Sequence, residues 1–118
     1  SAQGFWPALW LLPQDGDAPN SGYGELDTVE HLNFDPYVHM TLHSEYTNLV
    51  DKVNTPNAVQ APFNEGEFNI YGVEVHEDKV VYLVNNKEVY SYPRLYPEIP
   101  GQFPFYGQKQ FYVILSAQ

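Results

Sequence analysis

Three carboxylates follow one another closely in the stretch Gly24–Glu30, and their spacing suits acid–base chemistry. Glu25 and Asp27 are two residues apart, so on a β-strand they share one face. Glu30 lies three residues beyond Asp27 and joins that face only if one extra residue forms a β-bulge between them. Like charges in a row raise the pKa of at least one carboxyl group. A nucleophilic carboxylate beside a protonated carboxyl group is the pair that hydrolysis of a glycosidic bond with retention requires.

The same carboxylates could instead lie solvated on the exposed face of an edge strand. Leu26 and Val29 argue against that interpretation, because apolar neighbours predict a strand half-buried in a sheet. With a bulge, Glu25 and Glu30 are four pleat positions apart, roughly 13 Å along the backbone. A retaining pair needs about 5–5.5 Å between its carboxyl groups. The two side chains would therefore have to lean together over a concave sheet.

Two tryptophans precede the carboxylates and alternate with Ala8 onto one strand face. Trp6 and Trp10 could form part of a core stripe, or they could stack on sugar rings. Tryptophan combines a flat apolar face with a polar tip, which suits a carbohydrate ligand. We interpret Trp6 and Trp10 as substrate-binding residues.

Histidines offer a second candidate site. His39 and His43 share a strand face, and His31 could supply a third metal ligand. One sugar-facing histidine beside a packed or solvated one is the simpler interpretation, so the sequence predicts neither a metal site nor a cofactor. His76, near a hairpin, is expected to face solvent. The chain has no cysteine and no GxSxG, HExxH, zinc-ligand or phosphate-loop motif, which excludes those chemistries.

Composition narrows the class of protein further. The 118 residues suffice for one domain, and they carry 15 acidic and 5 basic side chains, a formal net charge of −10. Such an acidic chain repels phosphate backbones and anionic lipid, so we expect no nucleic-acid partner. No run of 18 apolar residues is present, so we expect no membrane-spanning segment.

Strand patterns dominate the elements that must position these residues. A Gly- and Pro-rich loop is expected at 13–24, a long loop at 44–66, an Asn85-Asn86 hairpin turn, an irregular segment at 93–107 and no helix. Turn signals every 8–12 residues predict an all-β fold, an antiparallel β-sandwich or jelly roll. The expected strands are residues 5–12, 25–32, 38–43, 68–76, 80–84, 89–92 and 111–117.

A strand begins close to the first residue, and another extends to the last. Residues 1–118 therefore read as a single central segment of a larger catalytic domain, with flanking strands missing on both sides. We expect a monomer, and we expect this segment not to fold stably alone, because a sandwich that lacks strands exposes apolar edges.

A combination of motifs resembles glycoside hydrolase family 16. It consists of Trp-Pro-Ala-Leu-Trp at residues 6–10, the Gly/Pro loop, and then ExDxxE in Gly24–Glu30, with fitting stretches at 41–43, 71–74 and 111–115. The bulged spacing is similar to that of laminarinases, agarases and related galactan-cleaving members, and unlike that of lichenases and xyloglucan transferases. Thr28 departs from the more usual aliphatic residue, with a small expected consequence for packing and none for the chemistry.

The resemblance implies a jelly roll with a long cleft and endo-acting, retaining hydrolysis of a β-linked polysaccharide. By this resemblance Glu25 looks like the nucleophile and Glu30 like the general acid/base, while Asp27 looks like the residue that controls the protonation and orientation of the nucleophile. His43 resembles a cleft histidine of the family. Gln118 follows a strand that resembles a cleft-lining one, so we expect it to hydrogen-bond sugar. Family members often bind a structural calcium on the convex side, which is possible in the full domain through ligands outside this chain.

Two substrate classes stay open at this point. One is laminarin-type β-1,3-glucan, and the other is β-linked galactan, including the poly-lactosamine chains of mucin-type O-glycans. A non-catalytic, lectin-like module on the same scaffold is the alternative function. It would be marked by loss of one of the two glutamates, and both are present. We expect a secreted, periplasmic or cell-surface location.

Overall fold

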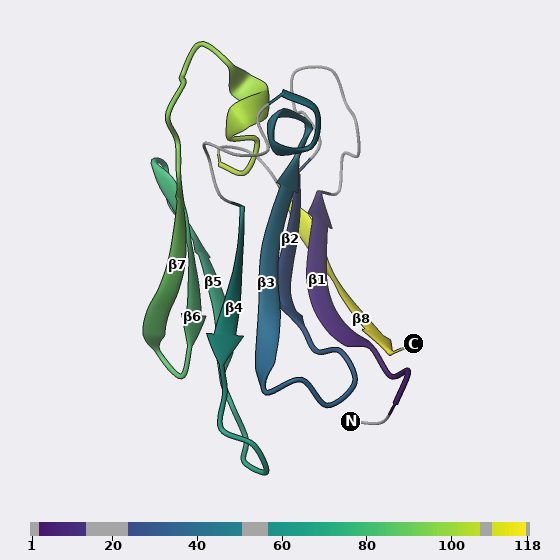
Figure 1. Cartoon of the computed structure of the whole chain (residues 1–118). Helices are drawn as coiled ribbons and strands as arrows, with labels where there is room; N and C mark the ends of the chain where they lie inside the picture. Colours follow the sequence, from purple (N-terminus) through teal and green to yellow (C-terminus); the bar gives the residue numbers. More distant parts are fainter. Residues whose placement is uncertain (1–2, 14–23, 51–56, 107–109, 118) are drawn as a thin grey trace.

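The computed structural model describes residues 3–13, 24–50, 57–106 and 110–117, which form two antiparallel β-sheets (Figure 1). One sheet has five strands in the order β4-β3-β2-β1-β8, and the other has three in the order β5-β6-β7. The elements are β1 (Pro7–Pro13), β2 (Gly24–Glu30), β3 (Tyr37–Ser44), η1 (Tyr46–Val50), β4 (Ala58–Pro62), β5 (Tyr71–Val75), β6 (Lys79–Val84), β7 (Lys87–Pro93), η2 (Pro100–Gln102) and β8 (Phe111–Ala117).

The core lies between the two sheets and is built by alternation. Along β3, Val38, Met40 and Leu42 are fully buried, while the residues between them face outward from the five-stranded sheet. Aromatic side chains fill much of the space that faces these three residues of β3. The buried residues contributed from the other side are Val80, Tyr82, Val84, Tyr92, Phe103 and Phe105.

Close packing against Phe105 requires a glycine at the first residue of β2. A Cβ atom on Gly24 would lie 2.9 Å from Cε1 of Phe105, so only glycine lets the ring approach the strand directly before Glu25. The Tyr82 hydroxyl donates a hydrogen bond of 2.8 Å to the carbonyl oxygen of Thr41 and so ties β6 to β3. The two sheets are thereby held together beneath the outward-facing carboxylates.

The expected hairpin between β6 and β7 is confirmed. Asn85 and Asn86 have φ angles of 51° and 66°, the left-handed conformation that a two-residue type I′ turn requires at both positions. The Asn85 side-chain oxygen accepts a hydrogen bond from the backbone N–H of Ile70, and the Asn85 backbone N–H donates to the Ile70 carbonyl oxygen. This turn therefore also anchors the segment that leads into β5.

The prediction of one long loop over 44–66 is wrong, because this segment contains the helical turn η1 and the strand β4. Only Val59 and Ala61 of β4 turn toward the core, which is too short an alternation to separate from a polar loop. The prediction of no helix likewise misses η1 and η2, each a single short turn. The loop expected at 13–24 falls almost wholly outside the described residues.

Sheet edges remain open in the described part of the chain. The strand β8 pairs with β1 alone, and its residues Val113 and Leu115 are 61% and 79% exposed. No helix among the described residues is long and apolar enough to cross a membrane.

Candidate active site

A β-bulge at Thr28 brings the third carboxylate onto the face of the other two. Asp27 lies opposite Thr41 of β3, and Glu30 lies opposite His39, so three steps along β2 match two steps along β3. The register with β1 shifts at the same place. The extra residue restores Glu30 to the outward face, as the sequence predicted.

The outer face of the five-stranded sheet has a hollow of about 180 Å³ at this bulge. Five residues predicted for the site line it, and Ala8 and Ser116 complete the lining. The predicted Gln118 lies outside the described residues. The lining residues are Trp6, Ala8, Trp10, Glu25, Asp27, Glu30 and Ser116.

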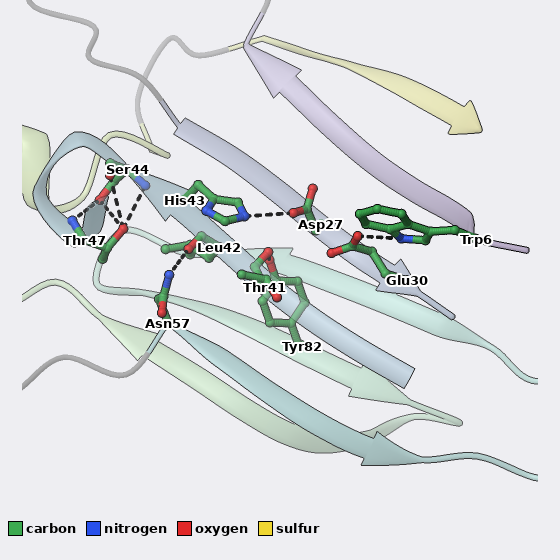
Figure 2. Close-up of polar contacts among 10 residues, drawn as sticks. All are labelled: Trp6, Asp27, Glu30, Thr41, Leu42, His43, Ser44, Thr47, Asn57 and Tyr82. Atoms are coloured by element: carbon green, nitrogen blue, oxygen red, sulfur yellow. Dashed lines mark hydrogen bonds and ion pairs between the residues drawn. The ribbon is translucent and has the colours of Figure 1, made fainter. Parts of the chain in front are cut away.

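Asp27 lines this hollow and is hydrogen-bonded to His43 of β3. The distance from His43 Nε2 to Asp27 Oδ2 is 3.1 Å, and the Asp27 side chain is 7% exposed (Figure 2). Burial raises the pKa of Asp27 to about 6; the hydrogen bond from His43 opposes this shift, and Glu25 adds to it. The hydrogen bond to Asp27 raises the pKa of His43, while burial opposes that rise. Asp27 can therefore hold a proton at mildly acidic pH.

Asp27 is also hydrogen-bonded to the side chain of Glu25. A protonated Asp27 has one O–H to donate, and an ionised Glu25 can only accept. When the proton is on Asp27, the hydrogen bond therefore runs from Asp27 to Glu25.

The end of β3 that carries His43 is held by a local hydrogen-bond network. The Ser44 backbone N–H donates to Thr47 Oγ1 at 3.0 Å, and the Thr47 backbone N–H donates to Ser44 Oγ at 3.1 Å. On the other side of His43, the side-chain amide of Asn57 donates to the Leu42 carbonyl oxygen at 2.8 Å (Figure 2). These bonds fix the backbone on both sides of His43.

The two tryptophans use their indole N–H groups differently. Trp6 Nε1 donates to Glu30 Oε2 at 2.9 Å, whereas Trp10 Nε1 donates to Ser116 Oγ at 3.3 Å. Trp6 is 42% exposed, so part of its ring remains accessible beside the hollow that it lines. Figure 2 shows the Trp6 ring beside the Glu30 carboxylate.

The histidines do not form the metal site that was conceivable from the sequence. His31 Nε2 contacts the Asp35 carbonyl oxygen at 2.8 Å and its ring packs on Phe63, while His39 faces Asp35 at 4.0 Å. His76 is exposed beside Glu74, as predicted. Among the described residues, one set of three possible ligands converges, with its ligand atoms within 4.8 Å of one another: Glu25, Asp27 and His43.

The carboxylates of that set already have partners within it, and acidic groups commonly converge without an ion.

Sequence reasoning missed three contributors to the site. Ser116 lines the hollow from β8, Asn48 forms a hydrogen bond with the His43 ring, and Ala8 lies directly opposite Glu30. Asn48 follows β3 in a segment predicted as loop, so no strand pattern placed it near His43. Side chains along β8 alternate between the two faces of the sheet, so Ser116 lies on the same face as Ile114. This alternation could have identified Ser116.

Several known proteins are similar to this chain. Residues 1–91 match a family model described as XgeA-like, catalytic GH16 domain. A beta-glucanase of Rhodothermus marinus is 31% identical over 98 residues, which cover 79% of this chain and 34% of the relative. A keratan-sulfate endo-1,4-beta-galactosidase of Sphingobacterium multivorum is 28% identical over 116 residues, which cover 97% of this chain and 27% of the relative.

The fold is shared with a solved laminarinase. The crystal structure of the laminarinase from Flavobacterium sp. UMI-01 superposes with a TM-score of 0.76 at 26% identity, over 98% of this chain and 49% of that chain. This chain thus spans about a third or less of the length of the two relatives and about half of the laminarinase. It belongs to glycoside hydrolase family 16, a family of retaining endo-glycosidases, and represents part of the catalytic domain.

Proposed function

We propose that the protein is an endo-acting, retaining glycoside hydrolase that cleaves a β-linked polysaccharide or glycan by double displacement. One observation carries this proposal. The Thr28 bulge places Glu25 and Glu30 on the walls of the same hollow, which is also lined by two tryptophans. Two carboxyl groups flanking a sugar site are the requirement for this reaction.

The first step forms a covalent intermediate. The Glu25 carboxylate attacks the anomeric carbon, and the bond from that carbon to the glycosidic oxygen breaks. Glu30, in its protonated form, gives its proton to the departing oxygen. Asp27 donates a hydrogen bond to Glu25 before attack and so orients the attacking oxygen.

The second step returns the enzyme to its starting state. Glu30, now a carboxylate, takes a proton from a water molecule whose oxygen attacks the anomeric carbon. The bond between the sugar and Glu25 breaks, and the Glu25 carboxylate is released. Two inversions at one carbon retain the configuration.

We propose two substrate classes for this site, β-1,3-glucan and β-linked galactan including poly-lactosamine. The relatives support both, because one is a beta-glucanase and the other a keratan-sulfate endo-1,4-beta-galactosidase. Substrates of this size do not cross membranes, so we also propose a secreted, periplasmic or cell-surface location. A single chain supplies both carboxylates, which favours a monomer as the active unit.

The test uses the complete enzyme, as wild type and as Glu25→Gln, incubated with laminarin, agarose and mucin O-glycans. We expect wild type to release oligosaccharides from one glycan and Glu25→Gln to release none. Glu88→Gln is the matched control, because Glu88 is an exposed carboxylate on β7 of the other sheet. Unchanged activity of Glu25→Gln would contradict the assignment of the nucleophile. Binding of a glycan by wild type without cleavage would favour a lectin-like function instead.

A further inference from the structure

We propose that Trp6 is a positioning residue for the general acid/base, in that its indole N–H holds Oε2 of Glu30 so that the catalytic proton is carried on Oε1. This inference rests on the proposed function, since it assigns Glu30 to proton transfer. It goes beyond sugar stacking, which concerns only the face of the ring.

The contact itself is directional. The indole group can only donate, and its nitrogen lies 2.9 Å from Oε2 of Glu30. A carboxyl group that accepts this bond on Oε2 has Oε1 left for the proton. The contact therefore distinguishes the two oxygens of a side chain that would otherwise be symmetric.

The pairing of β1 with β2 leaves room for this contact. Ala8 lies directly opposite Glu30, and its side chain is a single methyl group. Trp6, two residues before Ala8 on the same outward face, is the diagonal neighbour of Glu30, and a long aromatic side chain can span that diagonal. A larger residue at position 8 would occupy the path of the indole ring.

The backbone around Trp6 is clamped to the segment that directly follows Glu30. Three hydrogen bonds extend the pairing beyond the strands: the Gly4 N–H donates to Asn33 Oδ1 at 2.6 Å, the Asn33 N–H to the Phe5 carbonyl oxygen at 2.9 Å, and the His31 N–H to the Pro7 carbonyl oxygen at 3.1 Å. Gly4 and Asn33 both have positive φ angles, 80° and 53°. Trp6 is thus exposed to solvent yet held in place from both sides.

This positioning predicts a dependence on the leaving group. A sugar hydroxyl is a poor leaving group and needs the proton from Glu30, whereas 2,4-dinitrophenolate leaves without one. Trp6→Phe keeps a flat apolar ring and removes only the donor. We therefore expect its kcat/KM to fall about 10- to 100-fold on a substrate with a poor leaving group, the range for loss of a hydrogen bond to a charged group. On the dinitrophenyl substrate we expect a clearly smaller loss, because the proton from Glu30 is not needed there and any change in stacking affects both substrates alike.

The experiment measures kcat/KM of the complete enzyme on two β-glycosides of one oligosaccharide, in which the leaving group is either 2,4-dinitrophenol or the hydroxyl group of a further sugar. The oligosaccharide is laminaritriose or a lactosamine trisaccharide, according to the glycan that wild type cleaves. Trp10→Phe is the matched variant, because it removes an N–H that donates to Ser116 and not to a carboxylate. We expect Trp10→Phe to change kcat/KM on both substrates by the same factor.

A second variant tests the clamp without altering the ring. Asn33→Gly keeps the left-handed backbone and removes the acceptor of the Gly4 N–H, so the same selective loss on the substrate with the sugar leaving group is expected. Equal losses on both substrates in Trp6→Phe would overturn the positioning role and leave Trp6 as a stacking platform. A wild-type enzyme that cleaves neither glycoside would contradict the proposed function itself.

Discussion

His43 on β3 and Asp27 on β2 face each other across the two paired strands, with 3.1 Å between Nε2 and Oδ2. Both pKa values are raised, so in the folded protein this pair binds more protons than the unfolded chain does at mildly acidic pH. The stability of the fold is therefore linked to the same proton that Asp27 donates to Glu25 in the proposed mechanism.

This linkage predicts a decline of stability with rising pH. The pKa of Asp27 rises from 3.8 to about 6, so its neutral form is favoured in the fold and the unfolding free energy falls between about pH 4 and 6. The whole decline from Asp27 is on the order of 3 kcal/mol. His43 adds a contribution that is complete below pH 6.5 and is lost as the pH rises through its raised pKa.

Urea unfolding of the complete domain between pH 4 and 8 measures this slope. Asp27→Asn should flatten the part between pH 4 and 6, because the amide does not titrate. Asp78→Asn is the control, since Asp78 is exposed between β5 and β6 and its replacement should leave the slope in place. A wild-type unfolding free energy that rises over this range would contradict the assignment of the proton to Asp27.

Much of the fold and of this site could be predicted from the sequence because strand alternation is strong where it matters. Val38, Met40 and Leu42 alternate with polar residues, and the offset of Glu30 from Asp27 required a bulge. The Trp6–Glu30 bond could not be predicted, because it depends on the left-handed conformations of Gly4 and Asn33. The hydrogen bond from the Gly4 N–H to Asn33 joins residues 29 positions apart, a pairing that no local pattern contains.

The bulge residue leads to a prediction about stability. Thr28 is 2% exposed, and its Oγ1 has no hydrogen-bond partner among the described residues. A buried polar atom without a partner costs about 1–3 kcal/mol. Thr28→Val removes that atom and keeps the branched shape, so we expect the unfolding free energy to rise by about 1 kcal/mol with activity retained. Thermal unfolding of the complete domain measures the change.

Thr47→Val is the matched control for this substitution. The Thr47 hydroxyl is equally buried, but it is bonded to Ser44 through both the backbone and the side chain. The same change should therefore destabilise the protein, by about 1–3 kcal/mol. If both variants shifted the melting temperature in the same direction, the unpartnered hydroxyl at position 28 would not explain the effect.

The separate roles proposed for the two glutamates predict different products when an external nucleophile is supplied. Glu30→Ala should lose about 10²- to 10⁴-fold in kcat on polysaccharide, the usual contribution of a general acid/base. Azide needs no base, so with a dinitrophenyl glycoside it should restore turnover and yield the β-glycosyl azide. In Glu25→Ala, azide enters in place of the nucleophile, and the α-glycosyl azide is expected. NMR of the products distinguishes the two anomers, and the reverse assignment of anomers would exchange the two roles.

The β6–β7 turn offers a prediction that is independent of the site. Asn86 occupies the second position of a type I′ turn with a φ angle of 66°, where glycine is preferred. Its side chain is exposed, so Asn86→Gly should relieve backbone strain and raise the unfolding free energy by about 0.5–1 kcal/mol. Asn85→Gly should do the opposite, because it removes the side-chain bonds of Asn85 to Ile70 and Asn69. Chemical unfolding of both variants of the complete domain compares the two positions. A gain in Asn85→Gly as large as that in Asn86→Gly would mean that backbone strain, and not the side-chain anchor, dominates at this turn.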